Sequence, residues 1–491
     1  MAELPRCDLL NTGPGLSPAG NEEGTAVTHG NAPGSDTTDP ALAARVRDMM
    51  PQLKAELAEL VAIPSVSETG FPASSRPELL RARDAVATLF RDAGCEQISS
   101  LDLPDTAPVV IAEIPAPEGA PTVLMYSHYD VVPTGDLSLW HSPPFEPAER
   151  DGAIFGRGTA DTKSNILAHI GALRAWGGRP PVGVKAVIEG MEEVGGGAVT
   201  TYPPQDPEMF RADVMIIGDM GNVRPGVPTL TVALRGMANV TVEVRTLASA
   251  KHSGLYGGAA PDALLALIRA LGTLHDERGD VAVDGLRREE WAGASNTEEE
   301  FRALAEVVDG QPLIGTGSLG SRVWSGPGIT VIGIDVPSVD DAVNAVSPYA
   351  RAKLNLRVHP EQDAGEAQAA LMRHLTSQLP FDIRLEVHPG ATGNGFAART
   401  SSPAYAAARA AWSAAWGAET VTIGAGGSIP LVNALQQAVP DAEILLAGTA
   451  DGFANIHGPN ERVLLDEFEK ATLAEADLLG RLAAARGDGH H

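Results

Sequence analysis

Residues 122–130 read Thr-Val-Leu-Met-Tyr-Ser-His-Tyr-Asp, an apolar run of strand length that ends in a histidine and an aspartate. Similar apolar runs cover 109–114, 182–188 and 213–217, and a helical pattern covers 164–176. Short apolar strands that alternate with helices predict an α/β layer around a central sheet. Apolar positions at helical spacing predict two more helices before these strands, at 51–62 and 76–93.

The pattern changes at residue 228. Apolar and polar residues alternate at 230–234 and 240–244, which predicts a pair of half-buried strands with one face in solvent. Strand patterns at 329–334, 350–358 and 382–388 and helical patterns after Pro261 and at 366–378 complete a compact α+β insert. The first type of pattern then resumes, with helices at 403–416 and 466–485 and a strand at 443–447. We therefore expect a disordered tail at 1–40, a discontinuous domain at 41–227 and 391–488, and a smaller domain at 228–390.

The composition disfavours several classes of protein. A net charge of −27 over 491 residues argues against binding to nucleic acids or anionic membranes. No apolar run is long enough to cross a bilayer, and the first 39 residues lack the apolar core of a secretory signal. Two cysteines, Cys7 and Cys95, cannot form a disulfide framework, so we expect a cytoplasmic, reducing location.

Five short segments carry histidines and carboxylates, and most of them follow an apolar run. Together they offer two imidazoles and several carboxylates, which are the ligands that two adjacent divalent metals need. The segments are Ser127-His128-Tyr129-Asp130, Gly158-Thr159-Ala160-Asp161, Glu192-Glu193, Gly218-Asp219 and Ile456-His457-Gly458. Their joint presence predicts a hydrolase, although each segment alone is a weak signal.

The first two segments suit a metal ligand with its support and a bridging ligand. His128 and Asp130 face the same way on a strand, so Asp130 is placed to hold the imidazole of a metal-binding His128. An unrelated surface pair is the alternative for such a short pattern. Asp161 follows a glycine-rich turn, and its two oxygens could bridge two ions roughly 3.5–4 Å apart. A helix N-cap is the alternative function for Asp161.

The other three segments suit ligands and a base. Glu192 and Glu193 follow an apolar strand, and one could bind metal while the other takes a proton from water. Solvated surface acids are the alternative for this pair. Asp219 ends a strand of buried type, where open α/β sheets place their ligands. His457 lies in a turn-rich loop, where a lone histidine is more often exposed than a ligand.

Other catalytic patterns are missing from the chain. It has no His-Glu-x-x-His helix, no cysteine pair for zinc and no persuasive Gly-x-Ser-x-Gly elbow. The turn Gly427-Ser428-Ile429-Pro430 precedes a helix, so its amides could bind an anion such as a substrate carboxylate.

The order and spacing of these segments resemble the dinuclear-zinc family of carnosinase, carboxypeptidase G, acetylornithine deacetylase and related dipeptidases. The resemblance extends from about Leu53 to the C-terminal helix. It is carried by Tyr126–Pro133, Pro143–Pro147, Gly156–Lys163 and Met191–Gly195, while His252–Gly258 and Gly426–Pro430 resemble the dipeptidase branch. It implies a three-layer α/β/α catalytic domain with a central mixed sheet, interrupted by a smaller α+β lid that also forms a homodimer.

The resemblance also implies residue roles. Glu192 is the general base, Asp130 orients His128, and the insert's His252 reaches a neighbouring active site, where it stabilises the oxyanion with the metal. Ser428, with Gly427, helps to hold the substrate carboxylate. The implied cofactors are two divalent ions, zinc first and manganese or cobalt as alternatives. Their implied ligands are His128 and Asp219 on one ion, Glu193 and His457 on the other, and Asp161 between them.

This chain departs from the family pattern at several positions. Thr162 follows Asp161 where an acidic residue is usual, Ser164 stands where glycine is common, and Gly196 replaces a frequent serine. The lid of the family usually carries Asn-x-x-Pro-x-Arg, whose arginine grips the substrate carboxylate. Here Tyr349 takes that slot and Arg351 follows two residues later. Arg351 shares a strand face with that slot and is the candidate; a solvated strand residue is the alternative.

The expected function is metal-dependent hydrolysis of the amide bond of dipeptides or short peptides, with Glu192 as base for a water that two divalent metals activate. Two alternatives stay open. An N-acyl amino acid deacylase of the same fold would differ in its substrate pocket, and a non-catalytic binding protein on a retained fold would lack bound metal.

Overall fold

The computed structural model describes residues 37–427 and 429–487. The predicted disordered tail lies outside these residues except for its last four positions, and Ser428 lies outside them as well. Within the described part of the chain, no helix has both the length and the apolar character needed to span a membrane.

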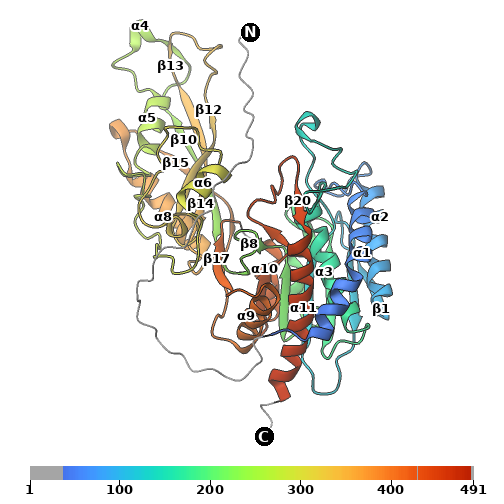
Figure 1. Ribbon diagram of the computed structural model, residues 1–491. Helices are drawn as coiled ribbons and strands as arrows, with labels where there is room; N and C mark the ends of the chain where they lie inside the picture. The colour runs from blue at the N-terminus through green and yellow to red at the C-terminus, as the bar shows by residue number, and fades with distance from the viewer. Residues whose placement is uncertain (1–36, 428, 488–491) are drawn as a thin grey trace. The chain divides into compact units, whose positions relative to one another are not determined.

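The larger sheet has nine strands and mixed direction, and its centre is parallel (Figure 1). Strands β3 and β7 are buried on both faces, which suits their continuous apolar sequences. The parallel centre contains β6 (Gly183–Glu189), β3 (Thr122–His128), β7 (Val214–Gly218) and β18 (Glu443–Ala447). The flanking strands are β1 (Gln97–Leu101), β2 (Val109–Ile114), β9 (Thr229–Leu234), β16 (Phe396–Ala397) and β17 (Val421–Ala425).

Helices cover both faces of this sheet, which gives the three layers expected from the sequence (Figure 1). Neighbouring residues of one strand enter different cores because side chains alternate across a strand. Val123 and Met125 pack with the helices α1 (Pro40–Val61), α2 (Arg76–Asp92), α3 (Ser164–Ala175), α9 (Pro403–Trp416) and α11 (Leu465–Gly487). Leu124 and Tyr126 pack in the core of α10 (Pro430–Ala438) and the short turn η4 (Gly197–Thr201), next to η5 (Pro203–Gln205).

The smaller sheet has four antiparallel strands with helices packed against it. In β10, buried Val240 and Val242 alternate with half-buried Thr241 and Glu243, as the period of two in the sequence predicts. The strands in spatial order are β12 (Gly328–Asp335), β14 (Tyr349–Val358), β10 (Gly236–Arg245) and β15 (Glu386–Gly393). The helices are α4 (Ser253–Tyr256), α5 (Ala263–Leu271), α6 (Glu298–Leu304), α7 (Leu319–Val323) and α8 (Ala364–Ser377), of which α5 and α8 fill the core.

Short strand pairs and turns complete the described elements. The pairs are β11 (Lys251–His252) with β13 (Ala345–Val346) and β8 (Gly221–Asn222) with β19 (Ala450–Asp451). A three-stranded ribbon contains β4 (Ala148–Arg150), β5 (Ala153–Phe155) and β20 (Arg462–Leu464). The short turns are η1 (Leu137–Leu139), η2 (Thr159–Lys163), η3 (Glu192–Val194) and η6 (Pro380–Asp382).

The predicted strand pair at 230–234 and 240–244 is wrong. Strand β9 pairs with β16, β17 and β18 in the larger sheet, whereas β10 pairs with β14 and β15 in the smaller one. Alternation marks each strand correctly but does not choose its partner. The chain changes sheets at Gly236, where a Cβ atom would lie 2.9 Å from the Gly393 carbonyl oxygen.

Two element boundaries also differ from those predicted. Helix α1 begins at Pro40, where the Asp39 carboxylate accepts a hydrogen bond from the Ala41 amide at 2.9 Å. The predicted start near Pro51 is too late because this proline lies inside the helix, and buried Leu42 continues the apolar stripe toward the N-terminus. Strand β15 begins at Glu386 rather than 382, because the preceding chain forms the η6 turn.

Candidate metal centre

The parallel strands bring four predicted site residues to one edge of the larger sheet. In the pairing of β3 with β6, His128 lies opposite Glu189, so Glu192 and Glu193 begin three residues beyond the end of β6. In the pairing of β3 with β7, Tyr126 lies opposite Ile217, and Asp219 follows two residues later. The carboxyl ends of adjacent parallel strands meet at the same edge, which is where open α/β sheets place functional groups.

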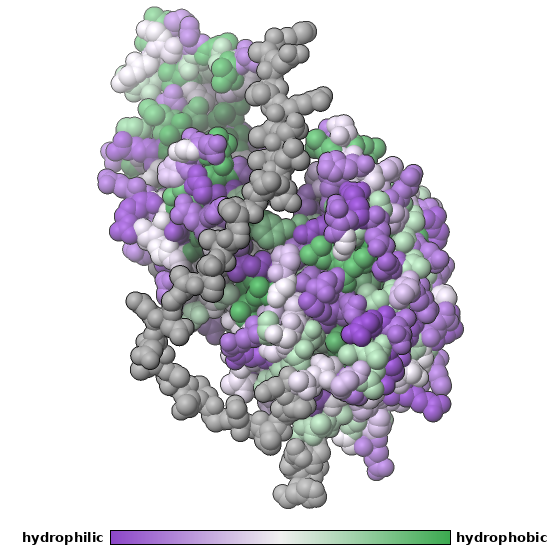
Figure 2. Space-filling model, viewed as in Figure 1, coloured by the Kyte–Doolittle hydropathy of each residue, from purple (hydrophilic) through white to green (hydrophobic). Residues whose placement is uncertain are grey.

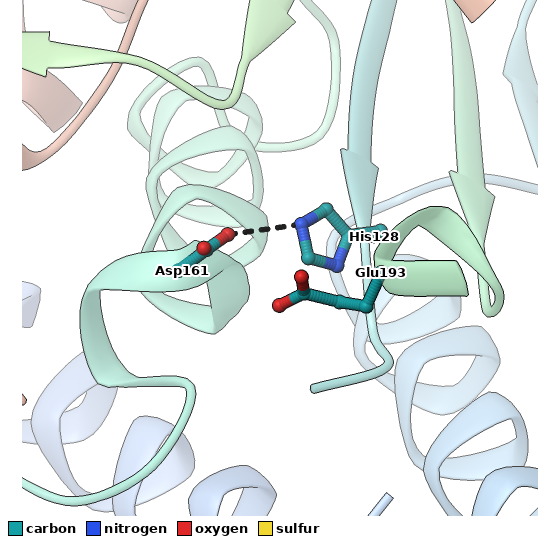
Figure 3. A group of neighbouring side chains, drawn as sticks. All are labelled: His128, Asp161 and Glu193. Carbon is teal, nitrogen blue, oxygen red and sulfur yellow. Dashed lines mark hydrogen bonds and ion pairs between the residues drawn. The ribbon is translucent and has the colours of Figure 1, made fainter. Parts of the chain in front are cut away.

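Asp161 lies between the two predicted histidine ligands. Its Oδ1 atom is 3.0 Å from Nε2 of His128, and its Oδ2 atom is 3.0 Å from Nε2 of His457. Figure 3 shows the side chains of His128, Asp161 and Glu193 pointing toward one another from β3, η2 and η3. Ligand atoms of these three residues all lie within 4.8 Å of one another. One carboxylate therefore faces two imidazoles, each with a different oxygen.

Glu193 and Asp219 extend this cluster on opposite sides. Oε2 of Glu193 lies 3.0 Å from Nε2 of His457, and Oδ1 of Asp219 lies 3.5 Å from Nε2 of His128. The five predicted metal ligands thus form one connected group. His457 adopts a left-handed backbone conformation with φ of 64°, which lets its exposed loop return toward the buried carboxylates.

Asp130 holds both His128 and the pair of glutamates. The Nδ1–H group of His128 donates to the Asp130 carbonyl at 3.0 Å, so the lone pair of neutral His128 is on Nε2, toward Asp161. The buried Asp130 carboxylate accepts hydrogen bonds from the amides of Glu192 and Glu193, both at 3.2 Å. This arrangement fits the expected orienting role and adds one that the sequence did not suggest, the placement of η3.

The electrostatics of the cluster show a surplus of buried negative charge. Burial, followed by the charge of Asp219, raises the pKa of Glu192 to about 9, and burial raises the pKa of Asp219 to about 6. Hydrogen bonds to Asp161 and Glu193 raise the pKa of His457 to about 10. A carboxyl group that is protonated at neutral pH cannot act as a base. Nearby divalent cations would reverse this, and imidazole and carboxylate donors are suitable ligands for them.

Glu461 and Arg157 connect the two loops that carry Asp161 and His457, and sequence reasoning assigned neither a role. The buried Glu461 carboxylate accepts hydrogen bonds from the amides of Gly158 at 2.9 Å, Ala160 at 2.9 Å and Asp161 at 3.0 Å. It also pairs with Arg157 at 2.7 Å, and Arg157 donates to the His457 carbonyl at 3.2 Å. The only available signal in the sequence was that Glu461 and Arg157 lie four residues from His457 and Asp161.

Glu189 is a second buried acid that sequence reasoning missed. It ends β6, and the Tyr126 hydroxyl donates to its Oε1 atom at 2.6 Å. Burial raises the pKa of Glu189 to about 8, so it is largely neutral at pH 7. A glutamate directly after the apolar run at 182–188 was the signal that could have identified it.

The contacts of Thr162 explain how a threonine fits at a position where the family usually has an acidic residue. Its hydroxyl donates to the Gly218 carbonyl at 2.7 Å, which ties η2 to the residue before Asp219. The Asn165 side-chain amide in turn donates to the Thr162 hydroxyl at 2.6 Å. Neutral groups therefore connect two ligand-bearing segments at this position. The hydroxyl groups of Ser164 and Thr449, both buried, form a hydrogen bond at 2.5 Å.

The remaining predicted site residues that the structure describes have no hydrogen bond or ion pair with this cluster. His252 is exposed on β11, and its Nδ1 atom accepts a hydrogen bond from the Gly254 amide at 3.1 Å. Arg351 is half exposed on β14 and forms an ion pair with Asp335 at 2.5 Å. Gly427 is exposed in a bend after β17. Ser428 lies outside the described residues.

Comparisons with known proteins match this geometry. The model of the family described as "Peptidase family M20/M25/M40" matches residues 124–481. A cysteinylglycine-S-conjugate dipeptidase of Corynebacterium striatum is 43% identical over 367 residues, 73% of this chain and 81% of that protein. The Beta-Ala-His dipeptidase of Homo sapiens is 27% identical over 446 residues, 83% of this chain and 85% of that protein. The crystal structure of human carnosine dipeptidase 1 matches with a TM-score of 0.73 and 25% identity, covering 90% of this chain and 98% of that one.

The family match contains all five residues of the cluster, namely His128, Asp161, Glu193, Asp219 and His457. The family model covers most of the chain, and the bacterial relative shares well over a third of the aligned residues. By its fold, its sequence and the order of its site residues, the chain belongs to peptidase family M20/M25/M40.

Proposed function

We propose that this protein hydrolyses the amide bond of dipeptides or short peptides in a metal-dependent reaction. Two relatives are named as dipeptidases, one for cysteinylglycine S-conjugates and one for Beta-Ala-His. The observation that carries the proposal is the placement of Asp161 at 3.0 Å from the imidazoles of both His128 and His457. This placement suits a carboxylate shared by two cation sites.

The donors divide into two sets around Asp161. His128 and Asp219 would hold one divalent ion, Glu193 and His457 would hold the other, and Asp161 would bridge them. Zinc is the proposed metal, and manganese and cobalt accept the same donors. When bound, such ions supply positive charge that activates a water molecule and polarises the scissile carbonyl group.

The protein's own groups would move the protons. Glu192 would take a proton from the attacking water and return it to the leaving amine. Its amide donates to the Asp130 carboxylate at 3.2 Å, and the His128 imidazole donates to the Asp130 carbonyl, so the same residue orients both groups. Asp130 is therefore a positioning residue in this proposal, and Glu192 is the catalytic base.

His252 would act across a homodimer. Because the Gly254 amide donates to its Nδ1 atom, the neutral ring carries its proton on Nε2, which leaves a donor for an oxyanion. Strand β12 is an edge strand with exposed Ile332 and Ile334, and helix α5 exposes Leu265 and Ile268. Figure 2 shows hydrophobic side chains at the surface over β12 and its neighbouring strands. Exposed apolar residues on an edge strand suit pairing with a second copy of the chain.

The domain division and the location also belong to the proposal. The division into 41–227 with 391–488 and 228–390 is supported by the separation of the strands into two sheets. Its boundaries do not coincide with the sheets, since β9 lies within 228–390 but pairs in the larger sheet, and β15 of the smaller sheet extends to Gly393. A cytoplasmic location is supported by the buried thiol of Cys95, which forms no disulfide within the described residues.

Hydrolysis of a small substrate panel tests the proposal. Metal-stripped protein would be restored with zinc, manganese or cobalt and given dipeptides, N-acetyl amino acids and N-succinyl amino acids. We expect metal-dependent cleavage of the dipeptides. Cleavage of the acylated amino acids alone would identify a deacylase instead, and no cleavage with any metal would contradict the enzymatic proposal.

A further inference from the structure

An arginine that is half-buried and has no counter-ion among the described residues lies where the chain passes from one sheet to the other. Arg235 follows β9 and precedes β10, and its amide donates to the Ala425 carbonyl at the end of β17 at 3.1 Å. The guanidinium group makes one long hydrogen bond, from Nη1 to the Gly326 carbonyl at 3.4 Å. Its Nε atom is fully buried and has no hydrogen-bond partner in the part of the chain that the structure describes.

Three other shielded arginines among the described residues are paired with acids. Arg157 contacts Glu461 at 2.7 Å, Arg174 contacts Glu56 at 2.6 Å, and Arg462 contacts Asp451 at 2.5 Å. Arg235 forms no ion pair with any acidic side chain among residues 37–427 and 429–487, although acidic residues outnumber basic ones in the chain by 63 to 36. An unpaired guanidinium in such an acidic protein indicates that an external anion completes the site.

A second arginine adds to the positive charge at this place. Arg357 on β14 lies opposite Gly328 of β12. A Cβ atom at Gly328 would be 3.4 Å from Nη1 of Arg235 and 3.9 Å from Cβ of Arg357, so both arginines border this glycine. Among the described residues, Arg357 also forms no ion pair with an acid. Burial, followed by the charge of Arg357, lowers the pKa of Arg235 to about 10, which leaves it charged at neutral pH.

Two glycines border the guanidinium group. A Cβ atom at Gly328 would be 3.4 Å from Nη1 of Arg235, and a Cβ atom at Gly426 would be 3.4 Å from Nη2. A planar guanidinium group with free donors binds carboxylates through two parallel hydrogen bonds. A small anion can approach between two glycines more closely than it could between larger residues.

We propose that Arg235, with Arg357 beside it, forms a carboxylate-binding site between β9, β12 and β17. The carboxylate has two chemical sources, the terminal carboxylate of a peptide substrate and a free carboxylate ion. The first source rests on the proposed peptidase function, and the second does not. Arg351 is less suited to this task, because its guanidinium group already pairs with Asp335.

Two measurements on the metal-loaded protein test the site. The first compares kcat/KM for a dipeptide and for its C-terminal amide in wild type, Arg235→Met and Arg357→Met. The second follows the unfolding temperature as acetate replaces chloride at constant ionic strength. Loss of a charged hydrogen-bonding pair should lower kcat/KM for the free acid about 10- to 100-fold, mainly through KM, and leave the amide nearly unchanged.

Arg245→Met is the matched control, since Arg245 lies exposed on β10 and contacts the Tyr349 ring. It should keep both the preference for the acid and the response to acetate. Arg235→Lys keeps the positive charge but cannot form two parallel hydrogen bonds with a carboxylate, so its kcat/KM for the free acid should lie between those of Arg235→Met and wild type. This variant replaces Arg235→Met in both measurements if Arg235→Met does not fold.

The outcomes separate the two sources. A preference for the acid that disappears in Arg235→Met identifies the substrate carboxylate. An unchanged preference with a lost response to acetate identifies a free carboxylate. If both measurements are the same in Arg235→Met and wild type, the site is disproved. If wild type cleaves no dipeptide with any metal, the peptidase proposal fails, while the acetate measurement still decides whether the site exists.

Discussion

Asp161 is the residue on which the candidate centre depends, because its two oxygens face imidazoles from separate loops at 3.0 Å each. Neutral His128 has its lone pair on Nε2, so this nitrogen and the Asp161 oxygen repel each other unless a proton or a cation lies between them. In the metal-free protein a proton fulfils this role, since hydrogen bonds to its acidic neighbours outweigh burial and raise the pKa of His128. A divalent ion would replace that proton.

At the residue scale, Glu192→Gln tests the proposed base. The amide side chain cannot take a proton, so turnover should fall at least about 100-fold, the usual lower size of base catalysis. Metal content should stay close to wild type, because Glu192 is not among the proposed ligands. Steady-state kinetics and metal analysis measure the two effects. Glu208→Gln, at an exposed position, is the control, and a Glu192→Gln variant with more than about a hundredth of the wild-type rate would show that another group is the base.

The buried pair of His169 and Glu475 predicts a dependence of stability on pH. Burial alone would lower the pKa of His169, but the Glu475 carboxylate at 2.7 Å outweighs it and raises the pKa. A raised pKa stabilises the folded state below the unfolded value of about 6.5, and this contribution is lost as the pH rises through the folded value. Urea unfolding of metal-free wild type and Glu475→Gln should therefore show a difference in unfolding free energy that shrinks as the pH rises.

Glu467→Gln is the control for this measurement. Glu467 is equally buried and accepts hydrogen bonds from the Gly226 amide and the Trp416 side chain, but it contacts no histidine. Its difference from wild type should not vary between about pH 6 and 9, where no partner of Glu467 titrates. A constant difference for Glu475→Gln over the same range would show that His169 stays neutral in the folded protein.

At the element scale, the hydrogen bonds of Glu461 and Arg157 connect the loop that carries Asp161 with the loop that carries His457. Glu461, 0% exposed, accepts three backbone amides of the Asp161 loop, and Arg157 returns a hydrogen bond to the His457 carbonyl. Glu461→Gln would place an amide donor against these amide donors. Changes in groups that support metal ligands typically cost about 10- to 100-fold in affinity or activity. We expect zinc affinity, measured by calorimetry, to fall by about this factor.

The same buried Glu467→Gln variant serves as the control for Glu461→Gln. It should lose stability without a comparable loss of zinc affinity, because Glu467 supports no residue of the proposed ligand set. The visible spectrum of cobalt-substituted protein gives an independent reading of ligand geometry. Unchanged affinity and spectrum in a destabilised Glu461→Gln variant would limit Glu461 to a general structural role.

At the scale of the whole molecule, the proposed dimer predicts complementation between two inactive variants. His252→Ala and Glu192→Gln should each be inactive alone. If His252 serves the neighbouring subunit, a mixed dimer contains one complete active site, and random exchange should restore about a quarter of wild-type activity. Mixing after mild dissociation, followed by kinetics, measures this recovery. Absence of recovery in a mixture that sedimentation shows to be dimeric would place His252 outside its neighbour's active site.

The segments that carry His128, Asp161, Glu192, Glu193 and Asp219 could be found in the sequence because each follows a local signal, an apolar run or a glycine turn. The two faces of β3 were likewise readable from its composition. The partner of β9 was not readable, because alternation specifies which residues are buried but not against which strand. Helix α1 was misjudged for a similar reason, since Pro51 reads locally as a helix start.

The sequence by itself determined the family, the three-layer architecture and the candidate ligands, because these depend on short-range patterns and their order along the chain. Only the tertiary structure decided which groups support those ligands. The contacts of Glu461 with Gly158 and of Asp130 with Glu192 join residues 303 and 62 positions apart. The same holds for Arg235, whose lack of a counter-ion is a property of its surroundings. Burial and partnership are set by distant parts of the chain, so no local pattern contains them.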